Sequence, residues 1–419
     1  MLIGAISDDL TGGTDLALMF KRAGMSVSQV IGVPEDLGST AEADAVVISL
    51  KSRTIPARDA VAQSLTAARA LREAGARQLF FKYCSTFDST DEGNIGPVSD
   101  ALLAETGAPW AIVCPAFPGA RRTIYQGHLF VGSELLSDSP MRNHPLTPMR
   151  DANLVRVLGR QSQNGVGLVP YTVVEKGAEA IRAALEAEAA AGRKLVVVDV
   201  LSDAHLMAIG AAQDGAPFIT GGSGIAMGLP ANFGIAANAD PASERLSAPE
   251  GRALVLAGSC SEATRGQIRA AEAAGMPAVR LDPFAIAEGG QPASELMAWL
   301  ARQPADRPAL IYASASPAEV AEAQRRLGTA EAGHLVEARI AEIAREAVAA
   351  GTTRLIVAGG ETSGAVVAAL GVKALAIGPE IAPGVPWTRV VSGPDIVLAL
   401  KSGNFGQEDF FLRAWDWLA

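Results

Sequence analysis

Two polar stretches in the first hundred residues contain side chains that could bind and deprotonate a small hydroxylated acid. The first, DDLTGGTD, places Asp8, Asp9, Thr11 and Asp15 directly after an apolar run. Carboxylates accept hydrogen bonds from sugar hydroxyls, and one of them can act as general base toward a hydroxyl nucleophile. An acidic helix start that complements the helix dipole is the alternative. The residues alone leave both interpretations open.

The second stretch, KYCSTFDSTDEGNIGP, covers residues 82–97 and mixes a cation with acids and hydroxyls. A polyhydroxylated acid needs this mixture, because a cation pairs with its carboxylate and the acids and hydroxyls bind its OH groups. The residues concerned are Lys82, Ser85, Thr86, Asp88, Ser89, Thr90 and Asn94. Lys82 could instead form a Schiff base or pair with an acid.

A third stretch, RRTIYQGHLFVG, adds Arg121 and Arg122, either of which can clamp a carboxylate. His128 and His144 lack the spacing of a tight metal site. The three cysteines form no CxxC pair, which favours reduced thiols in a cytoplasm.

In the C-terminal half, four apolar runs each end in small or hydroxylated residues: AGSCSEAT, YASAS, AGGETSG and KSGNFG. Ligands of open parallel sheets bind beyond the carboxyl ends of the strands. We therefore expect a nucleotide site there, although helix capping alone also explains each exit. No Walker or GxGxxG pattern is present, and Lys401 is the cation placed to reach a phosphate. The residues that could line this site are Ser259, Ser314, Gly359, Gly360, Glu361, Thr362, Ser363 and Gly403.

These residues need strands that position them, and the apolar pattern predicts such strands. LIGAIS reads as a strand, DDLTGGTD as its polar exit and LALMFKRAG as a helix; residues 118–148 read as a long loop. Strands alternate with helices throughout, which predicts an α/β fold of two domains, each with a mostly parallel sheet flanked by helices. We place the first domain at residues 1–235, a linker at 236–250 and the second domain at 251–419.

Composition excludes several classes of partner. The net charge of −10 argues against nucleic acid or an anionic membrane surface as partner. No apolar stretch approaches the ~20 residues of a membrane span. A soluble protein of the cytoplasm is therefore expected.

The quoted motifs, together with CPAFPGARRTIYQGHLFVG, HPLTPM, GSCSEATRGQ and LKSGNFG, resemble the four-carbon acid sugar kinases over nearly the whole chain. Within that family, GNIGP, YQGHLFVG and HPLTPM are most similar to the branch that acts on 3-oxo-tetronates; D-threonate and D-erythronate 4-kinases are close relatives. The resemblance implies a sugar-acid domain, a nucleotide domain with the active site in the cleft between them, and ATP-dependent phosphorylation of the O4 hydroxyl.

The resemblance also assigns residues. Nucleotide contacts fall on Ser259, on Gly359 through Thr362 and on Gly403, and sugar-acid contacts on Asp8, Asp9, Lys82, Ser85, Asp88 and Arg122. Asp8 or Asp9 would accept the O4 proton, and Mg²⁺ would bridge the ATP phosphates, with Glu361 and an N-terminal Asp as candidate ligands. A homodimer is a further expectation. An aldolase or isomerase using Lys82 on an already phosphorylated acid is the alternative from another enzyme class.

Overall fold

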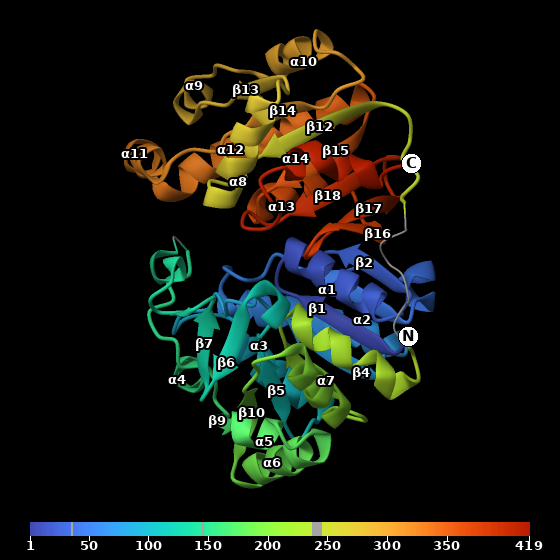
Figure 1. Cartoon of the computed structure of the whole chain (residues 1–419), viewed down its shortest axis with the longest axis vertical. Helices are drawn as coiled ribbons and strands as arrows, with labels where there is room; N and C mark the ends of the chain where they lie inside the picture. The colour runs from blue at the N-terminus through green and yellow to red at the C-terminus, as the bar shows by residue number, and fades with distance from the viewer. Residues whose placement is uncertain (35–36, 145, 237–244) are drawn as a thin grey trace. The chain divides into compact units, whose positions relative to one another are not determined.

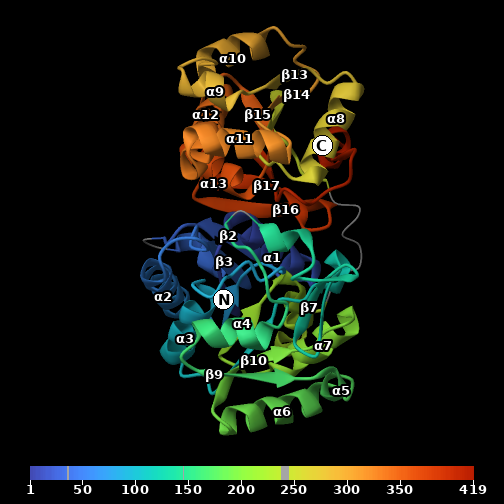
Figure 2. The same ribbon diagram turned by 90° about the vertical axis from the view of Figure 1, so that its left-hand side faces the viewer.

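The chain folds into two compact units, residues 1–239 and 240–419, and each is an α/β unit. The computed structural model describes residues 1–34, 37–144, 146–236 and 245–419. In each unit a sheet is flanked by helices (Figures 1 and 2). The predicted α/β class with mostly parallel sheets is therefore confirmed.

The main sheet of unit 1 is entirely parallel, with strand order β2-β3-β1-β4-β11-β5-β10-β9. From β1 the chain crosses to β2 and β3 on one side and then returns to β4 on the other. Ligands bind at such a switch point, beyond the carboxyl ends of the strands. The strands are β1 (Ile3–Ser7), β2 (Val27–Ile31), β3 (Ala45–Ser49), β4 (Gln78–Lys82), β5 (Ala111–Cys114), β9 (Gly165–Val169), β10 (Arg193–Val198) and β11 (Phe218–Gly221).

Helices connect these strands and cover the sheet; α1 packs on β2 and β3, and α2 packs on β1 and β4. The helices are α1 (Leu10–Arg22), α2 (Ala57–Glu73), α3 (Ile95–Thr106), α4 (Leu154–Gln161), α5 (Tyr171–Val174), α6 (Ala178–Ala190) and α7 (Asp203–Ala212). Short 3-10 helices are η1 (Gly38–Glu42), η2 (Pro118–Ala120), η3 (Pro140–Asn143), η4 (Ser223–Gly228) and η5 (Pro230–Phe233).

The segment 118–148, predicted to be a long loop, contains a second, antiparallel sheet instead. Its strands are β6 (Arg122–Tyr125), β7 (His128–Val131) and β8 (Glu134–Leu135). Gln126 and Gly127 form the two-residue turn between β6 and β7, and both have positive φ angles, 51° and 70°. Such a turn is typical of a tight hairpin. The strands are too short and too polar for periodicity alone to reveal them.

The sheet of unit 2 has the order β13-β14-β12-β15-β18-β17-β16. The first five strands are parallel, and β17 joins β18 and β16 in antiparallel pairs. Consequently β14, β12, β15 and β18 are consecutive neighbours whose carboxyl ends meet at one edge. The strands are β12 (Arg252–Ala257), β13 (Ala278–Arg280), β14 (Ala309–Tyr312), β15 (Thr352–Ala358), β16 (Ala374–Ala382), β17 (Val385–Ser392) and β18 (Val397–Lys401).

The helices of unit 2 are α8 (Glu262–Ala273), α9 (Pro283–Ala287), α10 (Ala293–Ala301), α11 (Pro317–Leu327), α12 (Thr329–Ala349), α13 (Gly360–Ala369), α14 (Phe410–Arg413) and the 3-10 helix η7 (Ala414–Trp417). Part of the core lies under the C-terminal segment, where fully buried Trp387 donates from its indole to the Ala414 carbonyl at 2.7 Å. Of the predicted linker 236–250, residues 237–244 lie outside the described part. Leu246 pairs with Leu418 in a parallel bridge within unit 2.

Two predicted loop segments are in fact the first turns of helices. Helix α1 begins at Leu10, because Asp9 caps it by accepting the Gly12 amide at 3.1 Å. A β-carbon on Gly13 would lie 2.0 Å from the Ser49 hydroxyl, so glycine lets α1 approach β3 closely. Helix α13 likewise begins at Gly360, directly after β15. The motif residues are therefore held on rigid elements.

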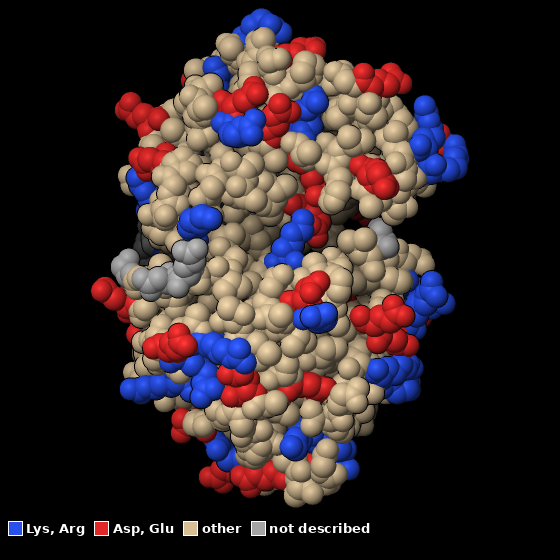
Figure 3. Space-filling view, turned by 180° about the vertical axis from the view of Figure 1, so that it is seen from behind, with Lys and Arg blue, Asp and Glu red and all other residues tan. Residues whose placement is uncertain are grey.

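Among the described residues, no helix has both the length and the apolar character that crossing a bilayer requires. On the face shown in Figure 3, lysines and arginines are interspersed with aspartates and glutamates.

Candidate functional site

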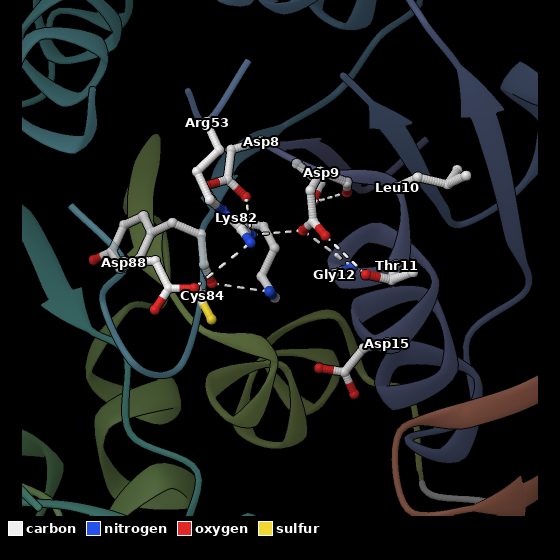
Figure 4. Close-up of polar contacts among 12 residues, drawn as sticks. Asp8, Asp9, Leu10, Thr11, Gly12, Asp15, Arg53, Lys82, Cys84 and Asp88 are labelled. Atoms are coloured by element: carbon white, nitrogen blue, oxygen red, sulfur yellow. Dashed lines mark hydrogen bonds and ion pairs between the residues drawn. The ribbon is translucent and has the colours of Figure 1, made fainter. Parts of the chain in front are cut away.

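Arg53 is the centre of a charged cluster at the ends of three neighbouring strands of unit 1 (Figure 4). Its Nε and Nη2 donate to the two carboxylate oxygens of Asp8 at 2.9 and 2.8 Å. The same Nη2 donates to Oδ1 of Asp9 at 2.7 Å, and Nη1 lies 3.7 Å from Oδ2 of Asp88. Asp8 and Asp9 follow β1, Arg53 follows β3 and Asp88 follows β4. A single cation therefore joins three strand ends.

The two adjacent carboxylates have different environments. Asp8 is 5% exposed, and burial raises its pKa above the usual value even though Arg53 acts against the shift. The side chain of Asp9 is 22% exposed. Burial also acts to raise the pKa of Asp9, but Arg53, Lys82 and local hydrogen bonds outweigh it, so that this pKa is lowered. Asp9 is thus the member of the pair that is both stably ionised and accessible.

Lys82 and Asp15 lie close to this pair of carboxylates. Lys82 is 2% exposed, and its Nζ donates to the Tyr83 carbonyl at 2.9 Å. Asp15, on α1, accepts a hydrogen bond from the Ser223 hydroxyl, while its Oδ1 has no hydrogen-bond partner among the described residues. Burial raises the pKa of Asp15, and the nearby Lys82 opposes the rise. The cluster therefore contains buried carboxylates in excess of its cations.

The turn after β4 supplies the remaining predicted residues of this region. Asp88 accepts the Thr86 hydroxyl at 2.6 Å, and Ser85 is half-buried in the same turn. Burial raises the pKa of Cys84 and of Cys114 to about 12. Thiols that remain protonated at neutral pH are poor nucleophiles, so neither cysteine is suited to nucleophilic catalysis.

Arg122 is separate from this cluster. It lies at the start of β6, and its Nη1 donates to the Ala120 carbonyl of its own loop. In the described parts of the chain it makes no hydrogen bond or ion pair with Asp8, Asp9 or Asp88. Its Nε is buried without a hydrogen-bond partner there. The structure thus brings together Asp8, Asp9, Lys82 and Asp88, and leaves Arg122 on the small sheet.

Sequence reasoning missed Arg53. The signal was present, because KSRT (residues 51–54) is the polar exit of β3, just as DDLT is the exit of β1. Asn94, which the sequence did single out, holds the Arg53 loop: its amide donates to the carbonyls of Ser52 and Ile55 at 2.8 Å and to that of Arg53 at 3.2 Å.

In unit 2 the four polar strand exits converge. Gly359 has a φ of 129°, which L-residues rarely adopt, and a β-carbon there would lie 2.8 Å from the Thr362 hydroxyl and 3.2 Å from the Ser259 amide. A β-carbon on Gly403 would lie 2.2 Å from the Ser259 hydroxyl. Ser314, on the fourth exit, donates its hydroxyl to the Ser259 carbonyl. Predicted residues after β14, β15 and β18 therefore each lie against Ser259, which follows β12.

A cavity of about 850 Å³ opens beside this group within unit 2. One end is lined by Ser259 and by the start of α13, residues 359–362. The rest of the cavity lies among α9, α11 and α12, where Phe284, Val320 and Val336 supply apolar surface and charged residues such as Glu319, Glu322 and Glu337 also line it. The guanidinium of Arg326 lies 4.1 Å from the centroid of the Phe284 ring. Ser314 and Gly403 do not line the cavity; they support Ser259, which does.

Lys401, expected to reach a phosphate, is fully buried instead. Its Nζ donates to the carbonyls of Ser402 and Gly403 at 3.0 and 2.9 Å and to the Thr264 hydroxyl at 3.1 Å. No group of three or more His, Cys, Asp or Glu in the described residues could hold a metal ion.

Comparison with known proteins agrees with this two-part layout. A family model described as a sugar-binding N-terminal domain matches residues 3–229, and one described as a nucleotide-binding C-terminal domain matches residues 254–411. The chain belongs to the four-carbon acid sugar kinase family. As a member of this family it is a phosphotransferase with a nucleotide-binding domain.

Close relatives of this sugar acid kinase are full-length matches. A curated protein from Burkholderia multivorans, named 3-oxo-tetronate kinase, is 54% identical over 99% of this chain and 97% of its own. One of the same name from Cupriavidus necator is 53% identical, over 99% and 96%. A solved structure from Salmonella typhimurium LT2, described as a candidate tRNA synthase, is 42% identical with a TM-score of 0.85 over 98% of both chains.

Proposed function

We propose that this kinase transfers the γ-phosphoryl group of ATP to the O4 hydroxyl of a 3-oxo-tetronate, giving the 4-phosphate. The names of the full-length relatives, at about 50% identity, support the acceptor. The observation that carries the proposal is the cavity of unit 2, which is lined both by a glycine-rich helix start with free backbone donors and by the apolar side chains of Phe284, Val320 and Val336. A nucleotide has the same polarity, with anionic phosphates and a flat apolar base.

In this proposal the start of α13 binds the phosphates of ATP. Amides of the first helical turn have no intrahelical acceptor and point toward an anion, and the helix dipole favours negative charge there. Glycine at 359 lets the strand end pass close to the Ser259 amide and the Thr362 hydroxyl, which lie at the same turn. The apolar walls contributed by Phe284, Val320 and Val336 receive the base.

In unit 1, Asp9 orients the O4 hydroxyl and accepts its proton. Asp9 is ionised and partly accessible, and its Oδ2 accepts the Thr11 hydroxyl at 2.8 Å rather than a guanidinium, whereas both oxygens of Asp8 are engaged by Arg53. Arg53 Nη1, whose contact in the described part of the chain is the 3.7 Å approach to Asp88, is available to the carboxylate of the acid. Lys82, Ser85 and Asp88 complete the binding side, and Arg122 is proposed to contact the same ligand from its loop. Phosphoryl transfer asks mainly for such alignment and charge neutralisation.

Mg²⁺ is proposed as the ion bound with ATP, neutralising charge on its phosphates. Mg²⁺ is commonly held by one or two carboxylates together with substrate phosphates and water, so a dedicated cage of acids is not required. Glu361 fits this pattern because it lines the cavity next to Gly360; an N-terminal Asp is the other candidate. The three free cysteines suit a cytoplasmic location, and a homodimer is proposed without a defined interface.

The deciding experiment measures ADP release from ATP across a panel of D-threonate, D-erythronate and the two 3-oxo-tetronates. We expect release with a 3-oxo-tetronate, strongest at saturating Mg²⁺, and loss of that release in Asp9→Asn. Release with D-threonate or D-erythronate alone would assign the protein to the neighbouring 4-kinases, which are the alternative. No release with any of the four acids would refute a sugar acid kinase of this kind.

The aldolase or isomerase alternative requires Lys82 to form an imine with substrate. Lys82 is 2% exposed and donates to the Tyr83 carbonyl, so no observation favours it. Borohydride trapping of a sugar acid on Lys82, or turnover without ATP, would support that alternative. The tRNA synthase description is not adopted, because relatives of higher identity are named kinases.

A further inference from the structure

Lys401 is a buried cation that has no acid partner. It is fully buried at the end of β18, and among the described residues it makes no ion pair. Burial lowers its pKa to about 7. A buried ammonium is costly unless its donors are satisfied, and methionine or leucine would fill the same space without that cost. The lysine therefore calls for a role beyond packing.

The hydrogen bonds of Lys401 hold the turn that follows β18, directly or through Thr264. Its Nζ donates to the carbonyl oxygens of Ser402 and Gly403 at 3.0 and 2.9 Å. The Gly403 oxygen also accepts the hydroxyls of Ser261 at 2.6 Å and Thr264 at 2.9 Å. Three donors thus converge on a carbonyl oxygen that has two lone pairs. This turn is held more firmly than chain reversal alone requires.

Holding these two carbonyls sets the direction of the neighbouring amides. In a planar trans peptide the N–H points opposite to the C=O of the same unit. The amides of Gly403 and Asn404 therefore point away from Lys401, and in the described chain neither donates to any group. Gly403 is half-buried and Asn404 is exposed, so this turn lies at the surface of unit 2.

This pair of amides lies beside the cavity. The missing β-carbon of Gly403 would be 2.2 Å from the Ser259 hydroxyl, and Ser259 lines the cavity next to the start of α13. Successive amides that point the same way form an anion-binding concavity. Lys401 itself cannot contact the anion, because its three donors are used on the far side of the turn.

We propose that Lys401 is a positioning residue for phosphate binding: it anchors the carbonyls of Ser402 and Gly403 so that the amides of Gly403 and Asn404 face the phosphates of the nucleotide. The proposal rests on the proposed use of ATP and adds a second group of phosphate donors to those of α13. It gives the buried lysine an indirect role in place of the direct phosphate contact expected from sequence.

The test measures the binding of ADP and of adenosine to the full-length protein by titration calorimetry. The ratio of the adenosine Kd to the ADP Kd isolates the contribution of the phosphates. Lys401→Met keeps a long unbranched side chain, one atom shorter than lysine, and removes its donors. We expect ADP to bind at least about tenfold more weakly in this variant, the loss of roughly one charge-assisted hydrogen bond, while adenosine binding stays within about twofold.

Thr388→Val is the matched control. Thr388 is also fully buried and donates to a carbonyl of β18, that of Leu398, at 2.8 Å, but it does not touch the turn. We expect Thr388→Val to lower the melting temperature without changing the ratio of the adenosine Kd to the ADP Kd. Thr264→Val removes one of the other donors to the Gly403 carbonyl and should weaken ADP binding relative to adenosine by a smaller factor. It serves as the test variant if Lys401→Met does not fold.

The possible outcomes separate the two proposals. If the wild-type protein binds ADP no better than adenosine, both the nucleotide assignment and the role of Lys401 are wrong. If the wild type prefers ADP strongly but Lys401→Met and Thr264→Val retain the full preference, only the role of Lys401 is wrong. Equal weakening of ADP and adenosine in Lys401→Met would likewise contradict a phosphate-specific role.

Discussion

Replacing Arg53 by glutamine tests whether a single cation organises the acidic cluster of unit 1. The substitution leaves Asp8 and Asp9 adjacent, largely buried and without their shared counter-charge. The Arg53 side chain is 22% exposed and that of Asp8 is 6% exposed, so the pair is only weakly screened by solvent. Removing one partner of a buried ion pair costs about 3–5 kcal/mol. We expect a loss of about 3 kcal/mol, because Arg53 keeps some contact with water.

The pH dependence distinguishes lost charge pairing from a general packing defect. In the wild type the pKa of Asp9 is lowered, so ionised Asp9 stabilises the fold above the ordinary Asp pKa of about 3.9, and this stability is lost as the pH falls through the folded-state pKa. Without Arg53 the pKa of both carboxyls should rise. The loss of unfolding free energy caused by Arg53→Gln should therefore be largest at neutral pH. It should shrink as acid protonates the carboxyls of Asp8 and Asp9.

The measurement is the free energy of unfolding in urea at pH 8 and pH 5.5, with ADP release measured on the same samples. Arg69→Gln is the matched control, because Arg69 forms a similar two-bond pair with Glu105, at 3.2 and 2.9 Å, on the surface of the same unit. We expect it to be neutral in both assays and Arg53→Gln to lose activity at least about tenfold. An Arg53→Gln deficit that is independent of pH, or no larger than that of Arg69→Gln, would refute the reasoning.

Three further substitutions test single contacts. Asp9→Asn should lower kcat about 100-fold, the size of a general-base contribution, while ADP binding stays unchanged; an unchanged kcat would exclude Asp9 as the general base. Gly359→Ala should weaken ADP binding at least about tenfold in calorimetry, because φ is 129° there and the new methyl would crowd the Thr362 hydroxyl; wild-type affinity would rule out a close approach of phosphate. Asn94→Ala removes three hydrogen bonds to the Arg53 loop and should lower kcat/KM without changing ADP affinity; equal kcat/KM would show that the loop needs no such support.

Much of the fold was readable because buried parallel strands are short apolar runs followed by polar exits. β1 stands where the pattern predicts it, and β12, β14, β15 and β18 form the four apolar runs that precede polar exits in the C-terminal half. The first turns of α1 and α13 were read as polar exits of the strands before them, because glycines next to a strand are also typical of loops. In the structure those glycines permit close approach, of α1 to Ser49 and of Gly359 to Ser259. The hairpin of β6 and β7 was missed because its strands span only four residues each.

The two halves of the candidate site differ in how far sequence could reveal them, and the reason is physical. The residues around Ser259 are small and allow neighbouring backbone segments to approach one another. Each can be recognised in the sequence by the glycines and hydroxyl residues at its own strand end. The cluster around Arg53 depends on which strands are neighbours, since β3, β1 and β4 adjoin only in space. Strand order is not written in any local pattern, so an arginine 44 residues from its partner Asp9 looks like an ordinary surface residue. Comparing all polar strand exits with one another, rather than only those rich in glycine or acids, would have selected KSRT as well. Arg53→Gln is therefore a test of that wider rule: if it is neutral, proximity of strand exits does not by itself identify functional residues in this fold.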